Sequence, residues 1–170
     1  LFLGRDPISA FHALFIVPVS SLAGIGELAL KASPLMLIAM GLTIGFRANI
    51  YNIGGEGQLI AGAICSGGVA LYFHHSQSAF LLPAMVLAGA LGGALWAAIP
   101  AVLRTRFNAN EILTSLMLSY VAELLLSYLV YGPWRDPDGF NFPQSRMFQA
   151  TALFPILLKG TRLNASIFIA

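Results

Sequence analysis

Long apolar stretches separated by short polar ones dominate the pattern of this chain. Residues 80–103 contain no charged residue, and residues 112–131 are apolar apart from one carboxylate and a few hydroxyl groups. Each stretch is close to the ~20 residues that an α-helix needs to cross a bilayer. We therefore expect two membrane spans in an all-α, polytopic transmembrane helical bundle. Small residues in the first span predict a face that packs closely against another helix: Gly89, Gly92 and Gly93.

A polar, glycine-rich insert divides an earlier apolar region. Residues 33–46 and 59–73 are apolar runs, each short for a complete span, and residues 49–58 lie between them. Hydrocarbon tolerates such polar groups only where protein encloses them, and broken helices line the substrate route of many transporters. We interpret residues 33–73 as a discontinuous helix pair at a substrate pathway, although a tight turn between two buried helices would give the same pattern. The candidate pathway or helix-break residues are Asn49, Asn52, Gly54, Gly55, Glu56, Gly57 and Gln58.

The span at 112–131 carries polar groups of its own. Glu123 lies near its centre, serines occur at four-residue spacing around it, and Glu111 lies one turn before the first of these serines. Because a four-residue step turns only about 40° around a helix, these groups predict one slanted polar stripe. A carboxylate within a span indicates a functional site, but a glutamate that holds two helices together fits equally well. The second-rank candidates, for the pathway or for helix packing, are Glu111, Ser115, Ser119 and Glu123.

The remaining segments are more polar or richer in proline. Residues 1–32 predict an external or interfacial segment with an amphipathic helix, in which Glu27 and Lys31 have the spacing of a helical ion pair. Residues 132–163 predict an external loop, because their prolines, aspartates and glycine favour turns. Residues 164–170 predict the start of a further span.

Positive charges indicate the orientation of the spans. Arg104 and Arg106 directly follow the clearest span, and cytoplasmic loops are enriched in arginine and lysine. We therefore place that end in the cytoplasm, together with Arg47, and residues 1–32 outside. The chain begins at Leu1 rather than at methionine and stops inside an apolar run, so we expect a single transmembrane domain that is truncated at both ends.

Composition narrows the class of protein further. Hydrophobic residues make up 58% of the chain and charged residues 9%, against roughly 25% charged residues in soluble domains. The net charge of +2 is too small to indicate nucleic-acid binding. Cys65 is the only cysteine, which excludes an internal disulfide and a cysteine-based metal site. Residues 54–57 lack the Gly-Lys-Ser/Thr ending of a nucleotide-binding loop, so any ATP-driven function needs a separate ATPase. We also expect no cofactor, no metal and no catalytic residues.

Five stretches carry a family resemblance. Residues 46–63 (FRANIYNIGGEGQLIAGA) are similar to the signature of bacterial ABC-importer permeases of the branched-chain amino acid, ribose and nucleoside superfamily, in its simple-sugar and nucleoside branch. Four other stretches agree in order: 31–34 (KASP), 110–120 (NEILTSLMLSY), 132–137 with 142–145 (GPWRDP and FPQS), and 160–163 (GTRL). The resemblance covers about residues 20–170.

The resemblance implies a multi-pass permease subunit in the lipid of the bacterial cytoplasmic (inner) membrane. Its partners would be a second related permease, an ABC ATPase and an extracytoplasmic solute-binding protein, with no nucleic acid. Its solute would be a nucleoside or a simple sugar. The coupling loop to the ATPase would follow the span that begins near Asn164. Two alternatives remain: an ion-coupled secondary transporter, whose broken helices look similar, and a structural membrane subunit that transports nothing.

Overall fold

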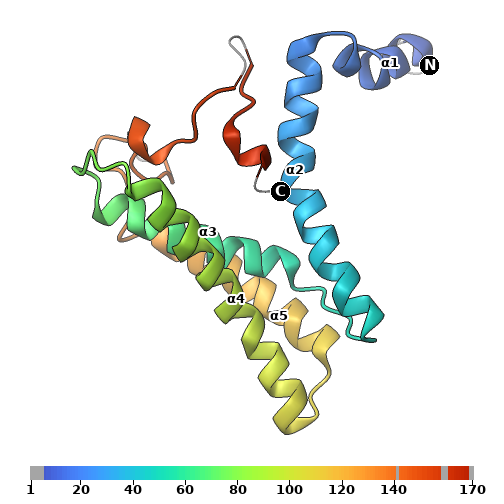
Figure 1. Cartoon of the computed structure of the whole chain (residues 1–170), viewed down its shortest axis with the longest axis vertical. Coiled ribbons are helices and arrows are strands. Elements are labelled where there is room, and N and C mark those ends of the chain that lie inside the picture. Colours follow the sequence, from blue (N-terminus) through green and yellow to red (C-terminus); the bar gives the residue numbers. More distant parts are fainter. Residues whose placement is uncertain (1–5, 141, 158–160, 169–170) are drawn as a thin grey trace. The chain divides into compact units, whose positions relative to one another are not determined.

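The computed structural model describes residues 6–140, 142–157 and 161–168. These residues form five α-helices, shown in Figure 1: α1 (Pro7–Phe15), α2 (Leu22–Arg47), α3 (Gly55–Tyr72), α4 (Leu81–Phe107) and α5 (Glu111–Tyr131). Three short 3₁₀ helices are also present: η1 (Val17–Val19), η2 (Ala150–Ala152) and η3 (Ala165–Phe168). Within the described ranges, β-structure is limited to two isolated bridges. The predicted all-α class is confirmed.

Three of the helices, α2, α4 and α5, are long and apolar enough to cross a membrane. Helix α4 covers the expected span and continues to Phe107, so that Arg104 and Arg106 lie in its last turn. Cations at that position interact favourably with the negative end of the helix dipole. Helix α5 begins at Glu111, after Asn110, whose Oδ1 accepts hydrogen bonds from the backbone N–H groups of Ile112 and Leu113. The predicted polytopic helical character is confirmed.

Helix α2 crosses the expected division of the chain at residue 33. It runs without interruption from Leu22 to Arg47, so the end of the predicted external or interfacial segment and the apolar run after it belong to one helix. Pro34 lies inside the helix, where it removes one backbone donor. Its neighbours are mostly leucine, alanine and methionine, which are strong helix formers and carry the helix through the proline. The apolar piece before the polar insert is therefore long enough for a complete span.

Contacts along the chain define two compact units. Unit 1 consists of Leu1–Gly41 with Phe154–Ala170, and unit 2 of Leu42–Leu153. In unit 1, Nε of Arg162 lies 3.0 Å from Oε1 of Glu27. Glu27 thus forms its ion pair with Arg162 rather than with Lys31, which corrects the predicted helical pair.

The segment after residue 154 folds back on itself within unit 1. The N–H of Leu157 donates to the carbonyl of Leu163 over 2.9 Å, and the N–H of Ala165 donates to the carbonyl of Pro155 over 3.0 Å. The expected start of a further span at 164–170 coincides in part with η3, and residues 169–170 lie outside the described residues.

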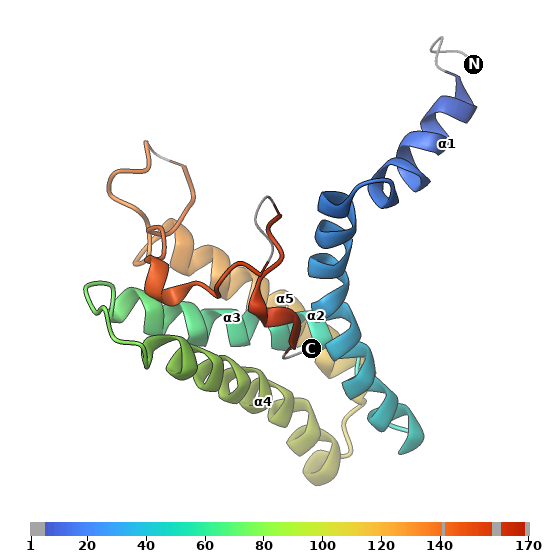
Figure 2. The same cartoon turned by 45° about the horizontal axis from the view of Figure 1, so that its top comes forward.

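In unit 2, α3 packs against both α4 and α5 (Figure 2). Its contact with α4 is a seam of small residues. A Cβ atom placed on Gly62 would lie 2.9 Å from the carbonyl oxygen of Gly89, and one on Gly92 would lie 2.7 Å from Cβ of Cys65. Both distances are shorter than real Cβ atoms tolerate, so the two backbones approach closely only because these side chains are missing. The predicted close-packing face of α4 is confirmed.

The loop after α5 folds onto the far end of α3. A Cβ atom placed on Gly68 would lie 3.4 Å from the Trp134 ring, and a Cβ atom placed on Gly67 would lie 3.7 Å from the Phe148 ring. Ala152 joins a small buried apolar cluster with Ala70, Leu81 and Met85. Trp134 therefore packs against glycines of α3.

Replacing Gly92 by alanine tests the seam. We expect Gly92→Ala in the full-length permease to destabilise the protein by about 1–3 kcal/mol, because the new methyl group overlaps Cβ of Cys65. Gly41→Ala is the matched control, since a Cβ there would have nothing within 4 Å. Thermal unfolding of the purified protein in detergent measures both. Equal melting temperatures for the two variants would contradict the close packing.

Candidate functional site

Helix α2 ends at the polar insert through a backbone motif centred on Asn49. The residue has a φ of 54°, in the left-handed region. The N–H of Ile50 donates to the carbonyl of Gly45 over 2.9 Å, and the N–H of Asn49 donates to the carbonyl of Phe46 over 3.1 Å. This pair of bonds is the Schellman arrangement that closes the C-terminus of a helix, and asparagine tolerates the left-handed position better than most residues. Asn49 therefore has a clear role in ending α2.

The residues between α2 and α3 are held by hydrogen bonds. Oδ1 of Asn52 accepts from the N–H of Gly54 over 2.8 Å. The N–H of Ile53 donates to Oγ of Ser115, on α5, over 3.2 Å. The rings of Phe46 and Tyr51 also pack together, with centroids 5.6 Å apart. The helix break is therefore an ordered segment attached to α5, and two of its backbone donors are satisfied by side chains.

Two glycines of the insert allow α3 to start directly against α5. A Cβ on Gly54 would lie 2.9 Å from Cβ of Ser115, and one on Gly57 would lie 2.8 Å from Cα of Ser119. Both glycines are buried. Their function at this point is steric, because any side chain would separate the helices. Gly55, the first residue of α3, is only partly buried.

The polar side chains of the insert do not converge. Glu56, in the first turn of α3, is exposed, and among the described residues it forms no ion pair. Gln58 is partly buried, and its backbone carbonyl oxygen would lie 3.2 Å from a Cβ on Gly93 of α4. Four of the seven predicted residues therefore shape the break, and one carboxylate, Glu56, projects from it: the four are Asn49, Asn52, Gly54 and Gly57.

The predicted stripe on α5 is divided as well. Ser115 and Ser119 are 2% and 8% exposed, and Oγ of Ser119 donates to the carbonyl of Ser115 over 3.2 Å. Glu111 forms an ion pair with Arg104, at the end of α4. Glu123 and Ser127 are exposed. The 40° drift per four-residue step carries the stripe out of the interface with α3.

One residue that the sequence analysis overlooked lies beside Glu123. Tyr120 is 56% exposed and precedes Glu123 by three residues, so that both lie on the same side of α5 together with Ser127. The spacing Tyr-x-x-Glu-x-x-x-Ser was visible in the sequence.

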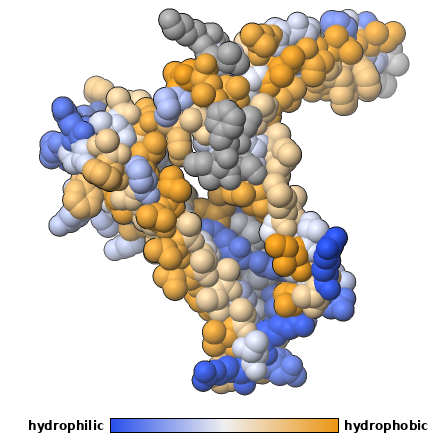
Figure 3. Space-filling view, viewed as in Figure 1, coloured by the Kyte–Doolittle hydropathy of each residue, from blue (hydrophilic) through white to orange (hydrophobic). Residues whose placement is uncertain are grey.

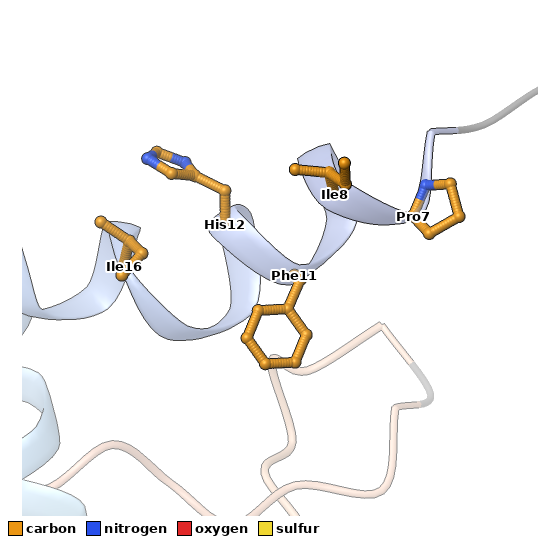
Figure 4. Close-up of a pocket in the computed structure, with 5 residues that line it drawn as sticks. All are labelled: Pro7, Ile8, Phe11, His12 and Ile16. Atoms are coloured by element: carbon orange, nitrogen blue, oxygen red, sulfur yellow. The ribbon is translucent and has the colours of Figure 1, made fainter.

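A hollow in the surface occurs elsewhere, on α1 (Figure 4). It is apolar and open, and it is lined by Pro7, Ile8, Phe11, His12 and Ile16. Asp6 caps this helix, and the pKa of its carboxyl group lies below the ordinary value because the backbone N–H of Ile8 and the hydroxyl of Ser9 donate to it. Both features belong to unit 1, whereas residues 49–58 belong to unit 2.

Comparison with known proteins gives the family. Residues 24–170 match the family described as branched-chain amino acid transport system / permease component. The chain is 42% identical to the glucose ABC transporter permease protein of Haloferax volcanii, over 91% of this chain and 40% of that protein. It is 31% identical to the nucleoside ABC transporter permease protein of Lactococcus lactis subsp. cremoris, over 98% of this chain and 48% of that protein.

A third relative is the guanosine ABC transporter permease protein of Bacillus subtilis, 30% identical over 75% of this chain and 36% of that protein. The chain thus spans less than half the length of these relatives. No solved structure matches it. The predicted resemblance to sugar and nucleoside permeases is confirmed, as is a multi-pass protein of the cytoplasmic membrane. The chain belongs to the permease component family of branched-chain amino acid transport systems.

Proposed function

We propose that this chain is part of the permease subunit of an ATP-driven ABC importer for nucleosides or simple sugars, and that residues 49–58 border its translocation pathway. The observation that carries this proposal is the ordered, non-helical segment between α2 and α3, which ends one apolar helix and starts the next. Non-helical backbone is tolerated at membrane depth only where protein or a water-filled cavity surrounds it. The relatives named for glucose, nucleosides and guanosine support the solute class.

The proposed importer needs further subunits. ATP is hydrolysed on a separate ABC ATPase, since the glycines at 54–57 are followed by Gln58 and Leu59 rather than by the lysine of a nucleotide-binding loop. A second related permease completes the membrane part, and an extracytoplasmic solute-binding protein delivers the solute. The names of the relatives as ABC transporter permeases support the ATPase and the binding protein.

The proposed orientation follows from three arginines. Arg47 lies at the end of α2, and Arg104 and Arg106 lie at the end of α4. Because α3 and α4 pack with Gly62 beside Gly89 and Gln58 beside Gly93, they are antiparallel, and the start of α3 lies at the same end as the arginines of α4. The excess of positive charge at this end supports a cytoplasmic location for it. The helix break then lies toward the cytoplasmic side.

Two substitutions of Asn49 distinguish a backbone role of this residue from a solute-binding role. We expect Asn49→Gly in the full-length protein to keep stability and uptake, because glycine readily adopts a φ of 54°. Asn49→Val is expected to destabilise the protein by ~1–2 kcal/mol, since a β-branched residue is strained in the left-handed region. Thermal unfolding and uptake of labelled solute are the measurements. Uptake lost in Asn49→Gly at normal stability would assign the side chain to the pathway instead.

Replacing Glu56 tests whether this residue borders the translocation pathway. We expect Glu56→Ala to lower uptake by roughly tenfold, equivalent to about 1.4 kcal/mol in the barrier, while the complex still assembles in the membrane. Leu59→Ala, another exposed position on α3, is the control and should transport normally. Uptake of labelled nucleoside and sugar into proteoliposomes, with ATP supplied or withheld, gives the rates.

Two outcomes would overturn the assignment. Normal uptake by Glu56→Ala removes this residue from the pathway. Uptake that persists without ATP and stops when an ion gradient is dissipated identifies a secondary transporter in place of an importer.

A further inference from the structure

Near its start, α3 has one side that neither α4 nor α5 covers. Gly57 faces α5. Gln58 and Cys65, which face α4, lie about 80–100° from Gly57 in one direction around the axis of α3. Glu56 lies about 100° in the other direction, and Ala63 lies close to it. Both are exposed. Glu56 therefore projects from the side of α3 that faces away from α4.

The stripe on α5 turns toward the same side. The stripe rotates by about 40° around α5 with each four-residue step. It begins at Glu111, which pairs with Arg104 of α4, and continues at Ser115 and Ser119, which contact α3. Its next steps, Glu123 and Ser127, turn further away from α4. Helices α3 and α5 run in parallel, because Gly54 meets Ser115 and Gly57 meets Ser119. The open sides of the two helices therefore form one flank of unit 2, opposite α4.

We call this surface the polar flank. It consists of Glu56 and Ala63 of α3 with Tyr120, Glu123 and Ser127 of α5, all of them exposed. Among the described residues, neither Glu56 nor Glu123 has an ion-pair partner. A carboxylate within a span is too costly to face lipid, and such residues normally face the bundle interior or a water-filled cavity.

Helix α4 presents the opposite character on its outer face. Leu87, Leu91 and Leu95 are 64%, 63% and 70% exposed and follow one another at four-residue spacing. Figure 3 shows apolar residues along α4, with hydrophilic ones gathered near its end. A side without polar groups is suited to lipid. Unit 2 therefore carries two carboxylates on the polar flank and leucines along this face of α4.

We propose that the polar flank lines the aqueous interior of the permease, with Tyr120 and Ser127 as further pathway residues, and that the leucine face of α4 contacts lipid. The solute assigned to this path rests on the proposed function. A carboxylate, a phenol and a hydroxyl on one side suit a neutral solute rich in hydroxyl groups. The relatives are more than twice as long as the part that this chain covers, so further segments are available to enclose the flank.

Cysteine accessibility in the complete transporter tests the two environments. The background is the full-length permease with its native cysteines, Cys65 included, replaced by alanine. Ser127→Cys probes the polar flank, and Leu91→Cys is the matched position on α4. We expect a charged, water-soluble methanethiosulfonate to modify Ser127→Cys at least tenfold faster than Leu91→Cys, and a nitroxide at Leu91 to be relaxed more by oxygen than by a nickel chelate.

Labelling of Ser127→Cys should also block uptake. Equal reaction rates at the two positions, or a Ser127→Cys that neither the charged reagent nor oxygen reaches, would overturn the aqueous assignment. High oxygen accessibility at Ser127→Cys would show that the flank faces lipid. Failure of the unmodified permease to take up nucleoside or sugar would reject only the solute, since the accessibility pattern is measured without it.

Discussion

The packing of unit 2 depends on a few glycines of α3, where the absence of a side chain lets the neighbouring helices come close. Gly57 touches the backbone of Ser119 on α5, and Gly62 touches the carbonyl of Gly89 on α4. Between membrane helices there is little hydrophobic driving force, because lipid is as apolar as the side chains themselves. Close backbone approach replaces it with dense van der Waals contact. This explains why α3, which carries more glycines than α4 or α5, is the helix against which both others pack.

The same contacts make the helix break possible. A non-helical segment exposes backbone donors and acceptors, which water cannot satisfy inside a membrane. Here Asn52 accepts one backbone hydrogen bond, Ser115 accepts another, and the bond from Ile50 to Gly45 closes α2. The bond to Ser115 forms only if α5 lies close to the insert, and Gly54 allows that distance. The break and the packing of α5 are therefore one structural feature.

Polar residues in this chain have two different physical roles. Ser115 and Ser119 are buried and satisfy backbone groups, and the Glu111 carboxylate is neutralised by Arg104. Glu56 and Glu123 have no such partner in the described part of the chain, and both project to the flank opposite α4. Residues of the first kind hold helices together. Residues of the second kind require water or further protein beside them, because a carboxylate within a span is too costly to face lipid.

The sequence by itself determined the all-α membrane class, the extents of α4 and α5 to within a few residues, the close-packing glycines and the family. These follow from hydropathy over windows of about 20 residues and from local spacing, which need no knowledge of neighbours. It did not determine the length of α2, since Pro34 and the charges near Glu27 resemble a boundary when no tertiary contact is known. It also could not separate Ser119 from Glu123, or Asn49 from Glu56. Only the tertiary structure decided those roles, because a polar residue becomes structural or free according to which helix lies beside it.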